Sequence, residues 1–327
     1  MLNLQLKICE IFHRIVFQKR FNKLHSHIRS KYHSRFFDEV IRKNKIDVLF
    51  APTASIEIAH LKTKIPVCYF SDATVNGISD YYDRFANISQ RSLKISNEIE
   101  QRAISKSTTQ VFSSQWAFDS AKIDYGSTNT FLVKMGANID KDPQEEEIMK
   151  QYDSVINLLF VGVDWNRKGG DIVLETIEKL DKNGYDIHLT VIGCIPPVKH
   201  SKMDVIPFLD KNKKDDMLKF QKLFKKSHLF FMPTRAECYG IVFCEANAYG
   251  LPVITTNTGG VPSVIEDGVN GFMLPLSAGS EDYFKVIGDL ISDEKKLKKM
   301  AISSREKYLK ELNWNHWGKE IKKTQGL

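Results

Sequence analysis

Two glutamates with seven residues between them, Glu237 and Glu245, are the side chains of this sequence best placed to do chemistry together. An apolar run at 229–233 predicts a buried strand before them, and residues 240–249 predict a short helix. Glu237 is therefore expected on the loop beyond a parallel strand, with Glu245 about 8 Å along the helix axis from Gly240. Open α/β sheets bind ligands at this edge, where a helix N-terminus favours negative charge. The spacing fits one carboxylate on a sugar and one on a ribose, with phosphates held between them.

A second segment carries positive charge at a comparable place in the predicted fold. The pair Arg167 and Lys168 follows an apolar run at 156–161, which predicts a strand, and precedes a helical pattern at 171–180. The two glycines after the pair let the backbone approach a ligand closely. Fixed cations can neutralise the charge of phosphates. The segment is therefore a candidate for binding a phosphorylated ligand.

Further motifs lie in register around these two segments, at 161–170, 246–254, 257–262 and 266–271. In order and spacing, from about residue 157 to residue 317, the sequence resembles the retaining glycosyltransferases of family 4, the group 1 glycosyl transferases. The resemblance implies the α/β fold called GT-B, in which two Rossmann-like domains each hold a parallel sheet. It also implies a hexosyltransferase with a nucleotide-diphospho-sugar donor and a glycan, lipid or protein acceptor, as in polysaccharide biosynthesis.

The resemblance also assigns roles to single residues. Glu237, the candidate catalytic residue, would face the hydroxyls of the donor sugar, and Glu245 would accept hydrogen bonds from the ribose, since a carboxylate can take two hydroxyl donors. Lys168 would contact the diphosphate. The implied donor-binding residues are Gly162, Arg167, Lys168, Phe208, Leu209, Tyr239, Gly240, Ile241 and Glu245.

Within that set, two groups would act through the backbone. The N–H groups of Tyr239, Gly240 and Ile241 would face the sugar and phosphate, and Phe208 and Leu209 would meet the base. One position departs from the family pattern, because an arginine usually follows the glycine at 162 and this chain has valine there. Arg167 is the candidate replacement for that diphosphate contact.

The expected chemistry uses no metal and no other cofactor. No Asp-x-Asp signature follows a predicted strand, and fixed cations and helix N-termini can stabilise a leaving nucleoside diphosphate instead. Family members are thought to react on one face of the sugar, with the donor's own phosphate helping to deprotonate the acceptor. The resemblance therefore implies retention without a side-chain base.

The composition is ordinary for a soluble globular protein: 327 residues, 42% apolar and 27% charged. No apolar run approaches the roughly 18 to 20 residues of a membrane span, and Lys7, Glu10 and Arg14 interrupt what would be a signal-peptide core. Five cysteines without a CxxC pair argue against a zinc site or a disulfide framework and favour the reducing cytoplasm. No module for nucleic-acid binding is recognised.

The net charge of +7 is concentrated at the start of the chain, where residues 1–35 carry eight Lys or Arg and one acid. One helical face there holds Leu4, Ile8, Ile11, Phe12 and Ile15. Two interpretations remain open. The helix packs on a core and presents a solvated basic face, or it touches anionic lipid and holds the protein peripherally on the inner face of a membrane.

Apolar segments alternate with helical ones in both halves, which predicts parallel sheets covered by helices. Residues 1 to about 43 are expected to be helical. The expected strands are 46–50, 66–70, 110–113, 130–134, 157–162, 188–192, 204–209, 229–232 and 252–255. The expected domains are an acceptor-side domain at 1–140, a linker at 141–150, a nucleotide-sugar domain at 151–312, and a helix at 313–327 that crosses back toward the first domain.

The N-terminal half resembles the family less closely. Asp72 follows a predicted strand and is the candidate acceptor-side residue, although a capping or turn role explains an aspartate there equally well. The usual first strand and Gly-rich loop are missing, since the chain opens into a helix and has no glycine before Gly77. We expect either a fragment or an enzyme with a reduced acceptor domain.

Three functions are alternatives to glycosyl transfer. The first is a nucleotide-sugar-binding remnant that lacks transfer activity because the Gly-rich loop is missing. The second, an epimerase of the same fold, needs acids and a histidine in the cleft, and no such set is evident. The third, a basic lipid- or nucleic-acid-binding module, predicts salt-dependent binding without nucleotide.

Overall fold

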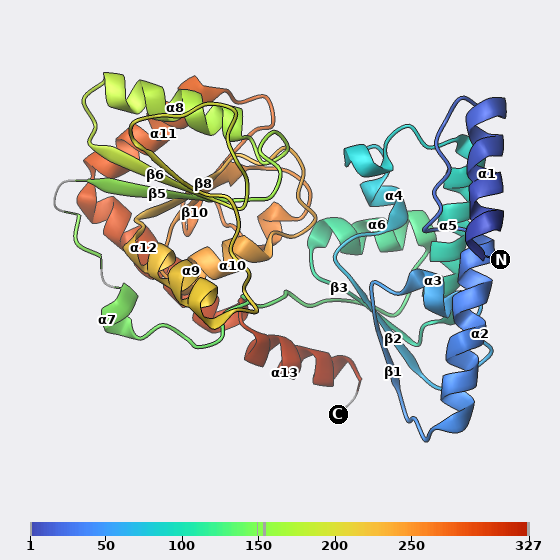
Figure 1. The fold of residues 1–327 in the computed structure, drawn as a ribbon. Helices are drawn as coiled ribbons and strands as arrows, with labels where there is room; N and C mark the ends of the chain where they lie inside the picture. The colour runs from blue at the N-terminus through green and yellow to red at the C-terminus, as the bar shows by residue number, and fades with distance from the viewer. Residues whose placement is uncertain (1, 149, 153–154, 326–327) are drawn as a thin grey trace. The chain divides into compact units, whose positions relative to one another are not determined.

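The computed structural model describes residues 2–148, 150–152 and 155–325 and has an α/β fold with two parallel sheets (Figure 1). The expected fold class is confirmed. The chain divides into two compact units, Met1–Val133 with Glu320–Leu327, and Lys134–Lys319. The division therefore falls before the expected linker, and the end of the last helix groups with the first unit.

The first unit holds a four-stranded parallel sheet in the order β1-β2-β3-β4. The strands are β1 (Leu49–Pro52), β2 (Val67–Ser71), β3 (Thr109–Phe112) and β4 (Thr130–Leu132). The helices are α1 (Leu2–Val16), α2 (His27–Lys43), α3 (Ser55–Ile58), α4 (Val75–Ile78), η1 (Asp83–Phe85), α5 (Gln90–Lys106) and α6 (Gln115–Tyr125). Serine N-caps begin several of these helices; Ser114, for example, accepts from the backbone N–H of Ala117.

The second unit holds a six-stranded parallel sheet in the order β10-β9-β8-β5-β6-β7. The strands are β5 (Ile156–Val161), β6 (Ile187–Ile192), β7 (Met203–Ile206), β8 (Leu229–Met232), β9 (Val253–Thr256) and β10 (Gly271–Leu274). The helices are α7 (Glu145–Ile148), α8 (Gly170–Lys182), α9 (Lys214–Lys226), α10 (Ile241–Ala248), η2 (Val261–Ser263), α11 (Ser280–Ser292), α12 (Glu294–Glu311) and α13 (Trp314–Thr324).

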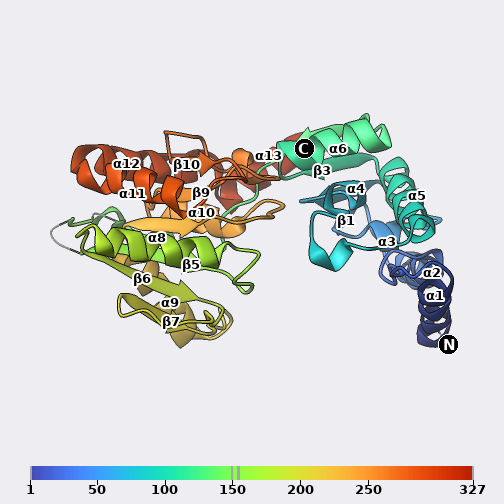
Figure 2. The same cartoon turned by 90° about the horizontal axis from the view of Figure 1, so that it is seen from above.

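The order of the second sheet creates a topological switch point between β5 and β8. From β5 the chain continues to β6 and β7 on one side, and from β8 it continues to β9 and β10 on the other. Figure 1 shows α8 and α9 on opposite faces of this sheet, and Figure 2, seen from above, shows α8 on the viewer's side. All four side chains of β8 are buried, as expected for a parallel strand with both faces covered. Ligands bind beyond the carboxyl ends of the strands at such a point.

Two expectations about elements were wrong. The segment expected to be helical up to about residue 43 forms two helices, because the chain breaks after Val16, adopts a positive φ of 51° at Gln18, and starts again at the N-cap Ser26. Strand β10 was not expected at all. It is short and completes the edge of the sheet beside β9. Its four residues carry no strong periodic signal.

Candidate functional site

The loop after β5 is shaped by three glycines that place the Lys168 side chain. A Cβ on Gly162 would lie 2.8 Å from Cγ of Lys168, so the lysine stem crosses the space that a side chain would fill. Gly169 has a φ of +75°, and its Cβ would lie 2.0 Å from the carbonyl oxygen of Pro233. A Cβ on Gly170 would meet the ring of Trp165. The loop after β5 therefore packs directly against the loop after β8.

The loop after β8 brings Glu237 to Lys168. Oε2 of Glu237 accepts a hydrogen bond from Nζ of Lys168, and the two side chains are only 13% and 10% exposed. The backbone of Glu237 also accepts from the N–H of Gly260, which ties the loop after β9 to the same place. The structure thus joins two predicted site residues that lie far apart in the sequence.

Arg167 links the two loops. Its Nη1 donates to the carbonyl oxygen of Ala236 at 3.1 Å, and its Nε lies 3.5 Å from the carboxylate of Asp164. The backbone oxygen of Arg167 accepts from the N–H of Arg235 at 2.8 Å. Arg167 therefore positions the loop that carries Glu237, and its side chain differs in direction from that of the neighbouring Lys168.

Helix α10 begins beside this pair with open donors. Within the described chain, the backbone N–H groups of Tyr239, Gly240 and Ile241 make no recorded hydrogen bond. Gly240 has a φ of +87°, and a Cβ there would lie 2.4 Å from the ring of Phe243, so the turn requires glycine. Open N–H groups and the helix dipole together favour a bound anion.

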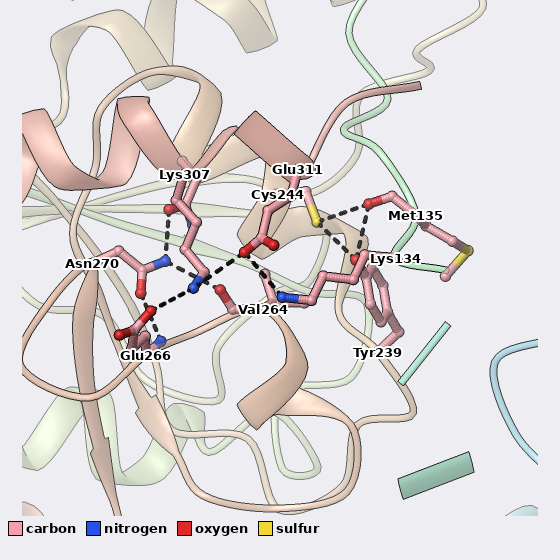
Figure 3. A network of polar contacts seen from close by, with 10 residues as sticks. Lys134, Met135, Tyr239, Cys244, Val264, Glu266, Asn270, Lys307 and Glu311 are labelled. Atoms are coloured by element: carbon pink, nitrogen blue, oxygen red, sulfur yellow. Dashed lines mark hydrogen bonds and ion pairs between the residues drawn. The ribbon is translucent and has the colours of Figure 1, made fainter. Parts of the chain in front are cut away.

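The Tyr239 side chain itself is structural. Its hydroxyl donates to the carbonyl oxygen of Met135 at 2.9 Å, and Sγ of Cys244 lies 3.7 Å from the same oxygen (Figure 3). Nearby, Glu311 pairs with Lys134 at 2.9 Å and with Lys307 at 3.3 Å. This network fixes the segment 134–137 against α10 and α12, and so holds the start of α10 in place.

Glu245 lies on α10, 2% exposed, and pairs with a residue that the sequence did not point to. Its Oε1 accepts from Nζ of Lys211 at 2.7 Å, while its Oε2 is buried without a recorded hydrogen bond. Nζ of Lys211 also lies 4.0 Å from the ring centroid of Phe220. Burial raises the pKa of Glu245, and the charge of Lys211 opposes that shift. No motif spacing marks Lys211, because its role depends on a tertiary contact.

The remaining predicted residues do not join the Lys168–Glu237 pair. Phe208 follows β7 and is 70% exposed, and Leu209 beside it is half-buried. Asp72 follows β2 and belongs to the first unit, where it is half-buried. The described ranges contain no group of three or more His, Cys, Asp or Glu residues placed to hold a metal ion. No described helix is long and apolar enough to cross a membrane.

Sequence comparison gives one family. Residues 142–307 match the family model described as glycosyl transferases group 1. An uncharacterized 41.2 kDa protein in the cps region of Klebsiella pneumoniae is 29% identical over 199 residues, 57% of this chain and 52% of that protein. The capsular polysaccharide biosynthesis glycosyltransferase CapM of Staphylococcus aureus is 26% identical over 174 residues, 51% of this chain and 46% of CapM. The chain spans about half the length of the curated relatives it matches.

Structure comparison supports the same fold. The Anabaena Alr3699/HepE structure in complex with UDP is similar with a TM-score of 0.69 and 18% identity, covering 90% of this chain and 81% of that one. At this identity the likeness establishes the two-sheet α/β architecture of such glycosyltransferases and nothing about ligands.

Proposed function

The chain belongs to the group 1 glycosyl transferases, and on that basis we propose that it moves a hexosyl group from a nucleotide-diphospho-sugar to an acceptor with retention of configuration. The observation that carries the proposal is the Lys168–Glu237 pair, which lies beside the open N–H donors of α10 at the switch point of the second sheet. Cation, carboxylate and helix N-terminus are the groups needed for a diphosphate next to a sugar.

In the proposed reaction, Lys168 leaves Glu237 and contacts the diphosphate, while Glu237 accepts hydrogen bonds from the sugar hydroxyls. The acceptor hydroxyl attacks the anomeric carbon on the face from which the nucleoside diphosphate departs, and its proton passes to a phosphate oxygen of that leaving group. The N–H groups at the start of α10 stabilise the negative charge that develops there. Glu245 accepts from the ribose, and Phe208 and Leu209 flank the base. We propose that Lys168 and the helix N-terminus take the place of a metal ion.

The acceptor proposed for this enzyme is a glycan, a lipid or a protein, with Asp72 as the candidate acceptor-side residue. The naming of CapM as a capsular polysaccharide enzyme favours a role in polysaccharide biosynthesis. We further propose a cytoplasmic enzyme that contacts a membrane peripherally through its basic N-terminal helix.

Calorimetry of the purified chain with UDP, GDP and ADP, with and without EDTA, tests the donor site. We expect one nucleotide to bind, unaffected by EDTA, and Lys168→Ala to weaken it by at least about tenfold, since a charge-assisted hydrogen bond is lost. Lys182→Ala, on the exposed end of α8, is the matched control and should change nothing. Unchanged affinity in folded Lys168→Ala would remove the assignment.

Turnover separates the enzyme from a binding protein that lacks transfer activity. Release of nucleoside diphosphate from the matching nucleotide-sugar, with the anomeric configuration of the product followed by NMR, should show transfer or slow hydrolysis with retention. Tight nucleotide binding without any turnover would favour the non-catalytic alternative.

A further inference from the structure

Helix α1 presents its apolar face to solvent. Leu4, Ile8 and Ile15 are 65%, 57% and 72% exposed, and Ile11 and Phe12 are also exposed. The buried residues of the helix, Leu6 and His13, lie on the opposite side. The helix therefore attaches to its unit by a narrow stripe while the wider apolar stripe has no partner within the described chain, which is unusual for a monomeric soluble surface.

Positive charge borders this apolar stripe. Lys7 and Arg14 are seven residues apart and so lie in one row of the helix surface, next to Leu4 and Ile11 respectively. Both are exposed. A helix with an apolar stripe flanked by cations is typical of segments that lie in the interface of an anionic membrane.

Arg14 also lines a cavity of about 680 Å³ in the first unit. The cavity is formed by the end of α1, the connection to α2, and the segment around η1. Its lining includes five cations and one acid: Arg14, Lys19, Arg20, Lys23, Arg84 and Glu10. A concave surface with this balance of charge attracts an anion.

Most of the cations that line the cavity form no ion pair with a carboxylate of a described residue. Glu10 pairs with Lys23 at 2.5 Å, so the acid offsets one cation. Nη1 of Arg20 donates to the carbonyl oxygen of Asp83 at 3.2 Å. Arg14, Lys19 and Arg84 have no recorded ion pair with any described residue. Three guanidinium or ammonium groups thus face solvent around one cavity.

The backbone that shapes the cavity is held in a specific conformation. Gln18 and Asn87, both in its lining, have positive φ values of 51° and 57°. Arg20 donates its backbone N–H to Asn87 and accepts from Ser89, which joins the two lining segments. Non-glycine residues in this region carry strain, and such strain persists where the surroundings fix it. The cavity is therefore a feature of the fold and not of loose side chains.

We propose that this cavity binds the phosphate headgroup of an anionic phospholipid while the apolar stripe of α1 enters the adjacent lipid. The first unit thereby docks on an anionic membrane surface, with Arg14 shared between headgroup and stripe. The inference deepens the membrane contact proposed above. It is independent of the donor site, since vesicle binding needs no nucleotide, so either can fail alone.

Co-sedimentation with vesicles tests the headgroup site. We expect the full chain to bind vesicles of equal parts phosphatidylcholine and phosphatidylglycerol and not vesicles of phosphatidylcholine alone. Each basic residue near an anionic surface contributes about fivefold in affinity, so the double variant Arg14→Ala with Arg84→Ala should bind about 25-fold more weakly. Lys299→Ala with Lys310→Ala on α12 removes the same charge and should bind within about twofold of the unaltered chain.

A second pair of variants tests the apolar stripe. Ile8→Asp should lower vesicle binding by at least about tenfold, and Ile302→Asp, an equally exposed isoleucine on α12, should not. All six substituted residues are exposed, and an unchanged far-UV circular dichroism spectrum checks that each of the four variants is folded.

Several results would overturn the proposal. Equal binding to both vesicle types, or equal losses in the α12 control variants, would make the contact non-specific. Binding of millimolar glycerol phosphate to the cavity in calorimetry, without any binding to phosphatidylglycerol vesicles, would assign the cavity to a free phosphate. If light scattering shows a dimer that Ile8→Asp dissociates, the apolar stripe would instead be the contact surface for a second copy of the chain.

Discussion

In the second unit the candidate ligand groups form ion pairs and are largely buried, whereas in the first unit most of the five cations that line the cavity have no recorded ion pair with a described residue. The buried pairs of the second unit suit a small ligand, because a ligand that replaces one partner makes strong, directed hydrogen bonds in a site that water reaches poorly. The exposed cations and the apolar stripe of the first unit suit a surface, because a partner that covers both gains binding free energy from each. The chain thus combines two candidate anion sites that differ in how deeply their charged groups are buried.

The largest expected difference concerns glycine at positive φ. Gly169→Ala in the second unit should lower the free energy of unfolding by about 3 kcal/mol, because the methyl group meets the Pro233 carbonyl and the residue must keep a left-handed φ. Gly126 in the first unit also has a left-handed φ, but an added Cβ there would meet no atom. Gly126→Ala should therefore lower the free energy of unfolding by only about 1 kcal/mol. Urea unfolding followed by circular dichroism measures both. Equal losses would contradict the close packing of the two site loops.

The next largest effect is expected for Glu237→Ala, which should lower the rate of transfer without a comparable loss of nucleotide affinity. If Glu237 contacts the sugar, kcat should fall by about a hundredfold, the usual effect of removing a group that acts in the transition state. The Kd for the nucleoside diphosphate should change by less than about fivefold, since Lys168 remains. Losses of equal size in kcat and affinity would assign Glu237 to phosphate binding instead.

In the first unit, a buried acid should make stability depend on pH. Burial raises the pKa of Glu100 to about 7, and the hydroxyl of Tyr69 donates to its Oε1 at 2.9 Å. Because the folded state then binds the proton more tightly than the unfolded chain, stability should fall as pH rises from about 4.5 to about 7.

The variant Glu100→Gln keeps an oxygen for Tyr69 and removes this titration. It should be more stable than the unaltered chain by about 2 kcal/mol at alkaline pH, with the difference closing in acid. Thermal unfolding across pH measures this. Glu306→Gln on exposed α12 is the control and should not alter the profile.

The smallest effect is expected for Lys211→Met, which leaves Glu245 buried without its cation. The pKa of Glu245 should rise further, and stability above that pKa should fall by about 1 kcal/mol, because Lys211 is itself partly exposed. The loss should disappear as pH falls and Glu245 takes up a proton. Lys213→Met, two residues away and exposed, is the control. A pH-independent loss would mean that Lys211 acts through its packing on Phe220.

Much of the second unit could be predicted because its signals are local. The expected strand 229–232 coincides with β8, and the expected helix at 240–249 contains α10. The first unit was harder, since dense Lys, Arg and His residues concealed the break between α1 and α2, where the chain turns without glycine or proline. Propensity alone does not locate such a break.

In the candidate site, too, local signals could be predicted and tertiary contacts could not. Lys168 and Glu237 were expected at one sheet edge, and the structure joins them as a direct pair. The pairing of Glu245 with Lys211, the use of Arg167 to link two loops, and the packing of Tyr239 on Met135 were not predicted. Each depends on which loops meet in three dimensions, and a single sequence carries no direct record of that.

The charges of Lys168 and Glu237 compensate each other in the ion pair, so a ligand that separates the pair must compensate for both charges. A ligand that offers only a diphosphate draws Lys168 away and leaves the carboxylate of Glu237 without a cation at a place that water reaches poorly. A ligand that offers only hydroxyls leaves the lysine with a weakened partner. A ligand that carries both groups at the right separation satisfies the lysine and the carboxylate together, so the ion pair disfavours ligands that carry only one of the two groups.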